Sequence, residues 1–222
     1  LRILRAFRFG ATTGFCFTED LKSAIIKYKH LALNPAKERI AYEILKLFGG
    51  NYSAKMLEQM DEFGILEMIF PFIKEMKKVP KNSHHHLDLF HHSIETVSQI
   101  EKFYNEASAD ILNHLNAVDF GGFPRINHLK LSGFFHDIGK YSTWTIESSG
   151  RHRFIKHDDV GAKMCVSYLK DLKFSKKQIE YISSMIKNHI YPSSVISSPI
   201  FKLAFFKNSS STTISLLFLG FS

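Results

Sequence analysis

Cysteines and long hydrophobic runs are both scarce in this 222-residue chain. Cys16 and Cys165 are the only cysteines and form neither a CxxC pair nor a ribbon spacing, which excludes a disulfide scaffold. The apolar run from Ile214 to Phe221 is far shorter than the roughly 20 residues that a membrane span needs. The first residues carry no secretory-signal pattern. These absences indicate a soluble protein of a reducing compartment, and we expect it in the cytoplasm.

Acidic side chains are also in deficit. The chain has 21 Asp and Glu against 29 Lys and Arg, and its formal net charge is +8. This excess favours a polyanionic partner such as RNA or a phosphorylated ligand. Hydrophobic residues, at 45%, are plentiful enough to form a core, which excludes a disordered chain.

Both ends of the sequence are unusual for a natural terminus. The chain starts at Leu1, already within a helical pattern, and stops at Ser222 directly after an apolar stretch. Natural termini are usually polar and frayed. We therefore expect this sequence to be a piece of a longer protein.

Hydrophobic spacing predicts one helix after another, and hence an all-α fold. Thr18 and Ser53 are predicted to cap helices, and Asn34-Pro35 is predicted to open one. Residues 140–156 are predicted to form a loop, and no strand-like alternation or hairpin turn competes. A polar stretch at residues 81–86 predicts a soft boundary. The expected units are neck and body helices over 1–80, a second helical domain over 86–192, and the start of a truncated helical tail over 193–222.

An adjacent histidine and aspartate end a strongly apolar helix predicted over residues 129–137. Burying the Asp137 carboxylate without a partner is costly. A divalent metal bound by His136 nitrogen and Asp137 oxygen would satisfy both groups. The alternative from the dipeptide alone is a helix-terminal aspartate beside a hydrogen-bonded core histidine.

Other histidines stand at helical positions around this pair: one of His91 and His92 upstream, and His157 and His189 downstream. With the motif HDIGK at residues 136–140, this order resembles the HD superfamily over residues 86–192. The resemblance implies an all-helical fold and a divalent metal (Mg²⁺, Mn²⁺ or Ni²⁺) that makes a nucleophilic water for phosphate-ester hydrolysis.

The ligand upstream stays open between two neighbours. The family pattern favours His92, whereas helical spacing brings His91 nearer the apolar face. The sequence also departs from many hydrolytic members, because no aspartate follows His189. His84, His85 and His86 are expected in a solvated loop, and no metal role is expected for the remaining histidines, His30, His114, His128 and His152.

Three arginines spaced three residues apart, Arg2, Arg5 and Arg8, lie on one flank of the first predicted helix. Guanidinium groups presented in this way suit phosphates and base edges. The alternative is a solvated basic face or a set of internal salt bridges.

This opening segment, together with Glu38-Arg39-Ile40 and residues 43–47, resembles the neck of the bacterial tRNA nucleotidyltransferases, the CCA-adding enzymes and their poly(A) polymerase relatives. Residues 63–71 resemble the body helix of that family, in which an HD domain follows the body in many members. The resemblance implies that Arg2 and Arg5 contact the incoming CTP or ATP, and that the partner is tRNA.

Phosphoryl transfer in that family needs a phosphate loop and an Asp-x-Asp pair that holds Mg²⁺ ions. No Asp-x-Asp occurs here, and the loop-like Gly121-Gly122-Phe123-Pro124-Arg125 follows no predicted strand. We therefore expect a tRNA nucleotidyltransferase fragment without its catalytic head, so that no catalytic residue for nucleotide addition is assigned. The alternatives are a stand-alone HD phosphohydrolase acting on nucleotides or cyclic phosphates, and a helical RNA- or protein-binding module with a decayed metal site.

Overall fold

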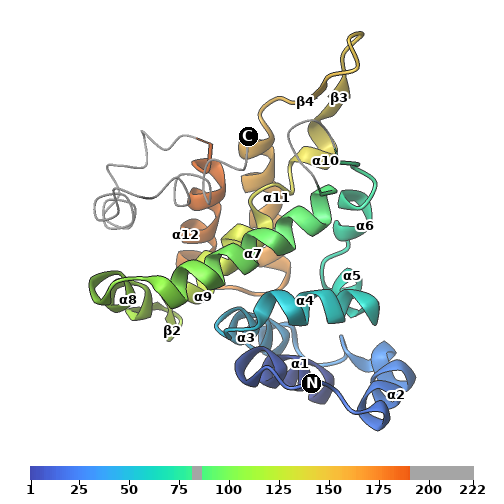
Figure 1. Cartoon of the computed structure of the whole chain (residues 1–222), viewed down its shortest axis with the longest axis vertical. Helices are drawn as coiled ribbons and strands as arrows, with labels where there is room; N and C mark the ends of the chain where they lie inside the picture. The colour runs from blue at the N-terminus through green and yellow to red at the C-terminus, as the bar shows by residue number, and fades with distance from the viewer. Residues whose placement is uncertain (82–86, 191–222) are drawn as a thin grey trace.

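The computed structural model describes residues 1–81 and 87–190, and these residues form a predominantly helical protein (Figure 1). The all-α prediction is confirmed. The histidines at positions 84–86 and the tail expected over 193–222 lie outside the described residues. No helix of the described part is long and apolar enough to cross a membrane.

The first half consists of short helices packed around the opening one. In chain order they are α1 (Arg2–Thr13), α2 (Glu19–Tyr28), the 3₁₀ turn η1 (Lys29–Leu31), α3 (Lys37–Phe48), α4 (Ser53–Glu62), α5 (Ile65–Ile69) and α6 (Ile73–Met76). Gly14 ends α1 with a φ of 74°, in the left-handed region that glycine tolerates best. Thr18 caps α2 as predicted, because its side chain accepts a hydrogen bond from the Leu21 amide.

Two predicted helix starts were wrong. Helix α3 begins two residues after Pro35, with Ala36 at the N-cap. Ser53 is the first residue of α4 and does not cap it; its hydroxyl donates to the carbonyls of Leu47 and Gly50. The first two amides of α4 are instead satisfied by Glu101, whose carboxylate accepts hydrogen bonds of 2.6 Å from the Ser53 amide and 3.3 Å from the Ala54 amide. Glu101, which is distant in sequence, therefore caps α4 in place of Ser53, the cap predicted from the sequence.

The second half is built on longer helices: α7 (Leu89–Glu106), α8 (Ala109–Asn116), α9 (Arg125–Phe135), α10 (Lys140–Thr143), α11 (His157–Asp171) and α12 (Lys176–Lys187). Asp88 caps α7 by accepting from the His91 amide. Ser175 and Gln178 form a reciprocal capping box at the start of α12.

Two short antiparallel ribbons contradict the prediction that the chain has no strands. Strands β1 (Val118–Phe120) and β2 (Phe123–Pro124) form the first ribbon, and β3 (Trp144–Ile146) and β4 (His152–Phe154) the second, within the stretch predicted as a loop. Strands of two or three residues are too short to show an alternating pattern in sequence. The second ribbon projects from the body of the molecule (Figure 1).

The two halves share one hydrophobic core. The main cluster of buried residues extends from Leu4 in α1 to Ile186 in α12, and a second, smaller cluster joins α7, α8, α9 and α12. Aromatic contacts cross between the halves: Phe48 lies 5.8 Å from Phe134, and Phe72 lies 4.7 Å from Tyr168, measured between ring centroids. The core therefore fixes the helices of the first half against those that carry the His-Asp motif.

Candidate metal centre and arginine helix

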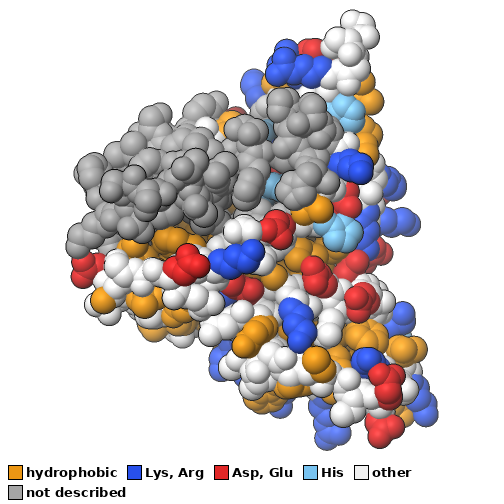
Figure 2. Space-filling model, in the orientation of Figure 1, with side chains coloured by type: hydrophobic (Ala, Val, Ile, Leu, Met, Phe, Trp, Pro, Cys, Tyr) orange, Lys and Arg blue, Asp and Glu red, His pale blue; other side chains and the backbone are white. Residues whose placement is uncertain are grey.

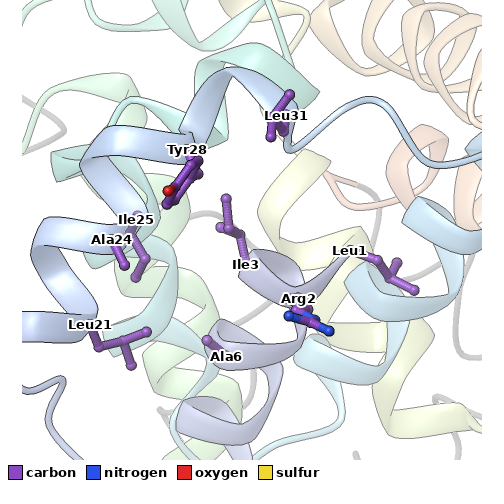
Figure 3. Close-up of a pocket in the computed structure, with 9 residues that line it drawn as sticks. All are labelled: Leu1, Arg2, Ile3, Ala6, Leu21, Ala24, Ile25, Tyr28 and Leu31. Carbon is purple, nitrogen blue, oxygen red and sulfur yellow. The ribbon is translucent and has the colours of Figure 1, made fainter.

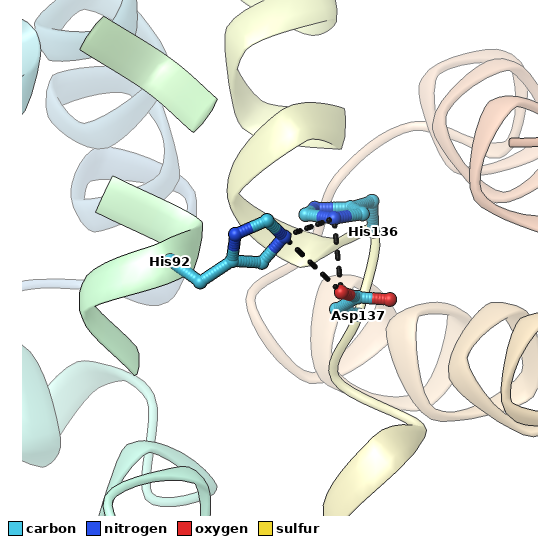
Figure 4. A group of neighbouring side chains, drawn as sticks. All are labelled: His92, His136 and Asp137. Atoms are coloured by element: carbon cyan, nitrogen blue, oxygen red, sulfur yellow. Dashed lines mark hydrogen bonds and ion pairs between the residues drawn. The ribbon is translucent and has the colours of Figure 1, made fainter. Parts of the chain in front are cut away.

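Four helices bring four imidazoles around one carboxylate. His92 lies in α7, His136 and Asp137 follow the last turn of α9, His157 begins α11, and His189 lies two residues beyond α12. Figure 4 shows the first three of these side chains pointing toward one another. The Nε2 atoms lie 3.1 to 3.5 Å from the Asp137 oxygens: His136 and His92 at Oδ2, and His157 and His189 at Oδ1.

The imidazoles form two pairs, one for each oxygen of Asp137. The Nε2 atoms of His92 and His136 are 3.2 Å apart, and those of His157 and His189 are also 3.2 Å apart. Within each pair the two nitrogens and Asp137 supply ligand atoms that all lie within 4.8 Å of one another. The cluster therefore contains two groups of candidate metal ligands, and Asp137 belongs to both.

Backbone carbonyls orient three of the rings. The Nδ1 atoms of His136, His157 and His189 lie 2.6 to 2.7 Å from the carbonyl oxygens of Gly133, Phe154 and Ile186 respectively. A carbonyl oxygen only accepts, so each Nδ1 carries the proton and donates it. This tautomer leaves a lone pair on Nε2, the atom that faces the centre of the cluster.

The electrostatics of the cluster suit a cation. Asp137 is 1% exposed; its Oδ2 lies 2.7 Å from the Lys140 ammonium, and both of its oxygens face the four Nε2 atoms. Burial acts to raise its pKa, but the adjacent His136 ring and Lys140 ammonium outweigh burial and hold the pKa well below the usual range. Burial lowers the pKa of His136 to about 4, so that this ring is neutral at pH 7. Neutral imidazoles and an ionised carboxylate are the protonation states that bind a divalent metal.

His91 and His92, between which the sequence left the upstream ligand open, lie in different environments. His92 is buried within the cluster, whereas His91 is exposed and its Nδ1 lies 2.6 Å from an Asp88 oxygen. The later aspartates do not join the cluster: Asp159 pairs with Lys187 and Asp171 with Lys37, and Asp158 is buried elsewhere in α11.

Sequence reasoning assigned no role to the last two residues of the HDIGK motif. Gly139 lies where α11 approaches most closely, and a Cβ there would overlap the His157 carbonyl oxygen. Its missing side chain is what allows His157 to reach Asp137. The Lys140 ammonium lies 2.7 Å from Asp137 Oδ2 and supplies a positive charge to the buried carboxylate. The adjacency of these residues to His136-Asp137 is the signal that could have identified them.

The arginine helix α1 is tied to α3 by one buried carboxylate. Glu43, 3% exposed, places its two oxygens 3.1 Å from Arg5 Nε and 3.0 Å from Arg8 Nε. The internal salt bridges considered from the sequence therefore exist for Arg5 and Arg8. Both arginines use Nε in these pairs, and the side chain of Arg5 remains 50% exposed.

Arg2 is exposed and lies at a cavity of about 480 Å³ between α1 and the α2–η1 segment (Figure 3). The lining is mostly apolar, with the Tyr28 ring on the α2 side. A mostly apolar lining beside a guanidinium is an environment that can take a ligand with an aromatic ring.

Comparisons with known proteins agree with this geometry. Residues 89–204 match the HD domain family, and residues 14–77 match the family described as the probable RNA and SrmB-binding site of polymerase A. A CC-adding tRNA nucleotidyltransferase of Thermus thermophilus is 26% identical over 196 residues, which are 86% of this chain and 41% of that protein.

Two further relatives carry related names. An A-adding tRNA nucleotidyltransferase of Deinococcus radiodurans is 26% identical over 197 residues, again 86% of this chain and 41% of the relative. A CCA-adding enzyme of Anoxybacillus flavithermus is 29% identical over 154 residues, 67% of this chain and 36% of that enzyme. The chain thus spans about 41% of the length of the first two relatives.

The helical fold and the His-Asp cluster define an HD-domain protein whose cluster indicates divalent-metal binding. The chain belongs to the HD domain family, and it is similar over most of its length to tRNA nucleotidyltransferases.

Proposed function

We propose that this chain is the nucleotide-selecting and RNA-binding part, with an attached HD domain, of an enzyme that adds CCA, or A residues, to tRNA 3′ ends from CTP and ATP. The observation that carries this proposal is the order of the two family matches, an RNA-binding segment followed by an HD domain, over a chain that aligns across 86% of its length with tRNA nucleotidyltransferases. These relatives favour that function over a stand-alone phosphohydrolase. For an enzyme that acts on tRNA in this way, the location we propose is the cytoplasm.

The polymerising carboxylates and their Mg²⁺ ions belong, in this proposal, to a part of the enzyme outside these 222 residues, because no Asp-x-Asp occurs within them. Arg2 and Arg5 contact the incoming nucleotide. The cavity beside Arg2 supports this role, since it offers an apolar wall next to a guanidinium fork. The ion pairs of Glu43 with Arg5 and Arg8, called the Glu43 clasp below, support the role of Arg5. They hold the Arg5 Nε atom in place and leave half of the side chain exposed.

Nucleotide selection is tested by replacing Arg2 in the full-length enzyme. We expect Arg2→Ala to weaken discrimination between CTP and ATP by about tenfold or more, the loss of one good bidentate contact, while tRNA binding changes little. The measurement is kcat/KM for each nucleotide beside a tRNA binding isotherm. Arg2→Lys is the matched control because it keeps the charge and removes the fork. Full selectivity in Arg2→Lys, or equal losses of selection and tRNA binding in Arg2→Ala, would leave only an electrostatic role.

We also propose that His92, His136, Asp137, His157 and His189 hold the metal of the HD domain. The four converging Nε2 atoms support this set, as does the buried Asp137 carboxylate that they face. Among Mg²⁺, Mn²⁺ and Ni²⁺, a donor set dominated by imidazole nitrogen favours Ni²⁺. A metal bound here supplies a Lewis acid that lowers the pKa of a coordinated water.

The neighbours His91 and His92 offer a matched pair of variants for the metal site. The purified chain is expected to retain divalent metal after extensive dialysis, and His92→Ala to lose affinity by about 10-fold or more. His91→Ala should keep its metal, since His91 is exposed and outside the cluster. Metal content by mass spectrometry and Ni²⁺ titration by calorimetry give the comparison. Equal metal binding by all three proteins would refute the site.

A further inference from the structure

Helix α11 has an apolar face and a basic face. Its buried residues, Asp158, Gly161, Ala162, Cys165 and Leu169, follow helical spacing and face the core. Lys163 and Lys170 are exposed, and seven residues correspond to almost two full turns, so they lie on one line along the helix. Lys156, the exposed N-cap residue of α11, stands seven residues before Lys163 and has a left-handed backbone (φ 59°). These three side chains are called the lysine row below.

The lysine row is not neutralised by the rest of the molecule. Each acidic residue of α11 is accounted for: Asp158 is buried, Asp159 lies 3.5 Å from Lys187, and Asp171 lies 2.5 Å from Lys37. Within residues 1–81 and 87–190, none of the three lysines of the row forms an ion pair. Asp159 and Asp171 remain 44% and 69% exposed on α11, but each pairs with a lysine of another segment, so the three lysines of the row keep their charges unpaired among the described residues.

The basic surface continues beyond both ends of α11. At its start, Arg151 is exposed in the projecting β3–β4 ribbon, where Figure 2 shows basic side chains gathered. At its end, the Lys37–Asp171 pair joins α11 to the start of α3, the helix that carries Glu43 and its bound arginines. The row thus runs between the ribbon and the neighbourhood of the arginine helix.

We propose that the lysine row is a docking surface for the sugar-phosphate backbone of the tRNA, and this inference rests on the proposed function. Successive lysines rise about 10 Å apart along α11, so they offer a straight series of point charges. Such a series suits the regular phosphates of a double-stranded RNA arm and carries no sequence preference of its own. The HD domain would then hold RNA through an outer helix as well as binding a metal.

The test measures binding of the purified 222-residue chain to a fluorescent tRNA transcript that ends before CCA, over a series of salt concentrations. Lys163→Ala and Lys170→Ala are each expected to weaken binding about three- to fivefold at low salt and to reduce the slope of log affinity against log salt by about one. Lys102→Ala is the matched control, because Lys102 is equally an exposed helical lysine but lies on α7. It should bind as the unmodified chain does.

Any of the following results would contradict the proposed docking role of the lysine row. Unchanged tRNA binding by both α11 variants would overturn this inference and leave the proposed function standing. Equal losses in Lys102→Ala would show a general charge effect without a docking surface. Loss of binding to phosphatidylserine vesicles with intact tRNA binding would assign the row to membranes. Failure of the unmodified chain to bind tRNA would overturn both the inference and the tRNA-binding part of the proposed function.

Discussion

His128 is fully buried yet lies outside the metal cluster. Its ring packs among Phe120, Phe123 and Tyr181, and its Nδ1 lies 3.3 Å from the Pro124 carbonyl oxygen. Burial lowers its pKa below 6.5, because an imidazolium would lose its hydration. At the scale of the single residue, this histidine makes the stability of the fold depend on pH.

The sign of that dependence follows from the lowered pKa. The unfolded chain takes up the proton at higher pH than the folded one, so the free energy of unfolding falls as pH drops below about 6.5. His128→Gln should remove this contribution and flatten the loss between about pH 7 and pH 5, by at most about 1.4 kcal/mol per pH unit. Urea unfolding across that range measures it. His30→Gln, a change at an exposed histidine, should keep the original slope; an equal flattening there would contradict the assignment.

The sequence predicted which residues form the candidate site, but it did not predict the contacts that position them. The HDIGK motif and the positions of the other histidines identified the five side chains that converge, although their role as ligands stays a prediction. The choice of His92 over His91 depends on contacts between α7 and α9, which helical spacing within α7 does not contain. The orienting carbonyls of Gly133, Phe154 and Ile186 carry no sequence signal, because every residue has a carbonyl.

At the scale of elements, helices were predictable and their boundaries less so. The apolar spacing of α1, α3 and α7 is strong, and local caps at Thr18 and Asp88 agree with it. Where a tertiary contact replaces a local one, as Glu101 does at the start of α4, the local rule gives the wrong cap. The two ribbons were missed because their strands are shorter than the pattern that identifies a strand.

The Glu43 clasp between α1 and α3 gives a prediction at this scale. Glu43→Gln should lower the free energy of unfolding by about 1–3 kcal/mol, because two guanidinium groups lose a buried counter-charge. Arg8→Lys should cost more than Arg5→Lys, since the Arg8 side chain is 19% exposed and that of Arg5 is 50% exposed. Urea unfolding measures all three. Glu19→Gln, at an exposed pair with Lys22, should change little, and an equal loss there would show that the clasp is not special.

At the scale of the whole molecule, the two sequence-predicted units share one core and a buried polar link. Lys130 of α9 is 1% exposed and donates a 2.6 Å hydrogen bond to the Gly50 carbonyl between α3 and α4. Glu101 of α7 caps α4 beside it, and the Lys130 ammonium lies 3.4 Å from that carboxylate. Burial lowers the pKa of Lys130 and raises that of Glu101, which shows how far both have been removed from water.

Because the core is continuous, we expect a destabilising substitution in the first half to lower the unfolding midpoint of the second half as well. Phe7→Ala, at a fully buried ring of α1, should cost about 3–5 kcal/mol. The fluorescence of Trp144, the only tryptophan, should report the same lowered midpoint as far-UV circular dichroism. A Trp144 transition that keeps its original midpoint while the circular dichroism shifts would show two independent folding units.

The order of the cluster residues along the chain bears on how the protein is made. His92, His136 and Asp137 leave the ribosome well before His189, which lies at the end of the described residues. A nascent chain can therefore offer an ion one half of the cluster early, but the second imidazole pair forms only after His189 has been synthesised. An ion bound there would join the end of α12 to α7, α9 and α11, four helices that are far apart in sequence.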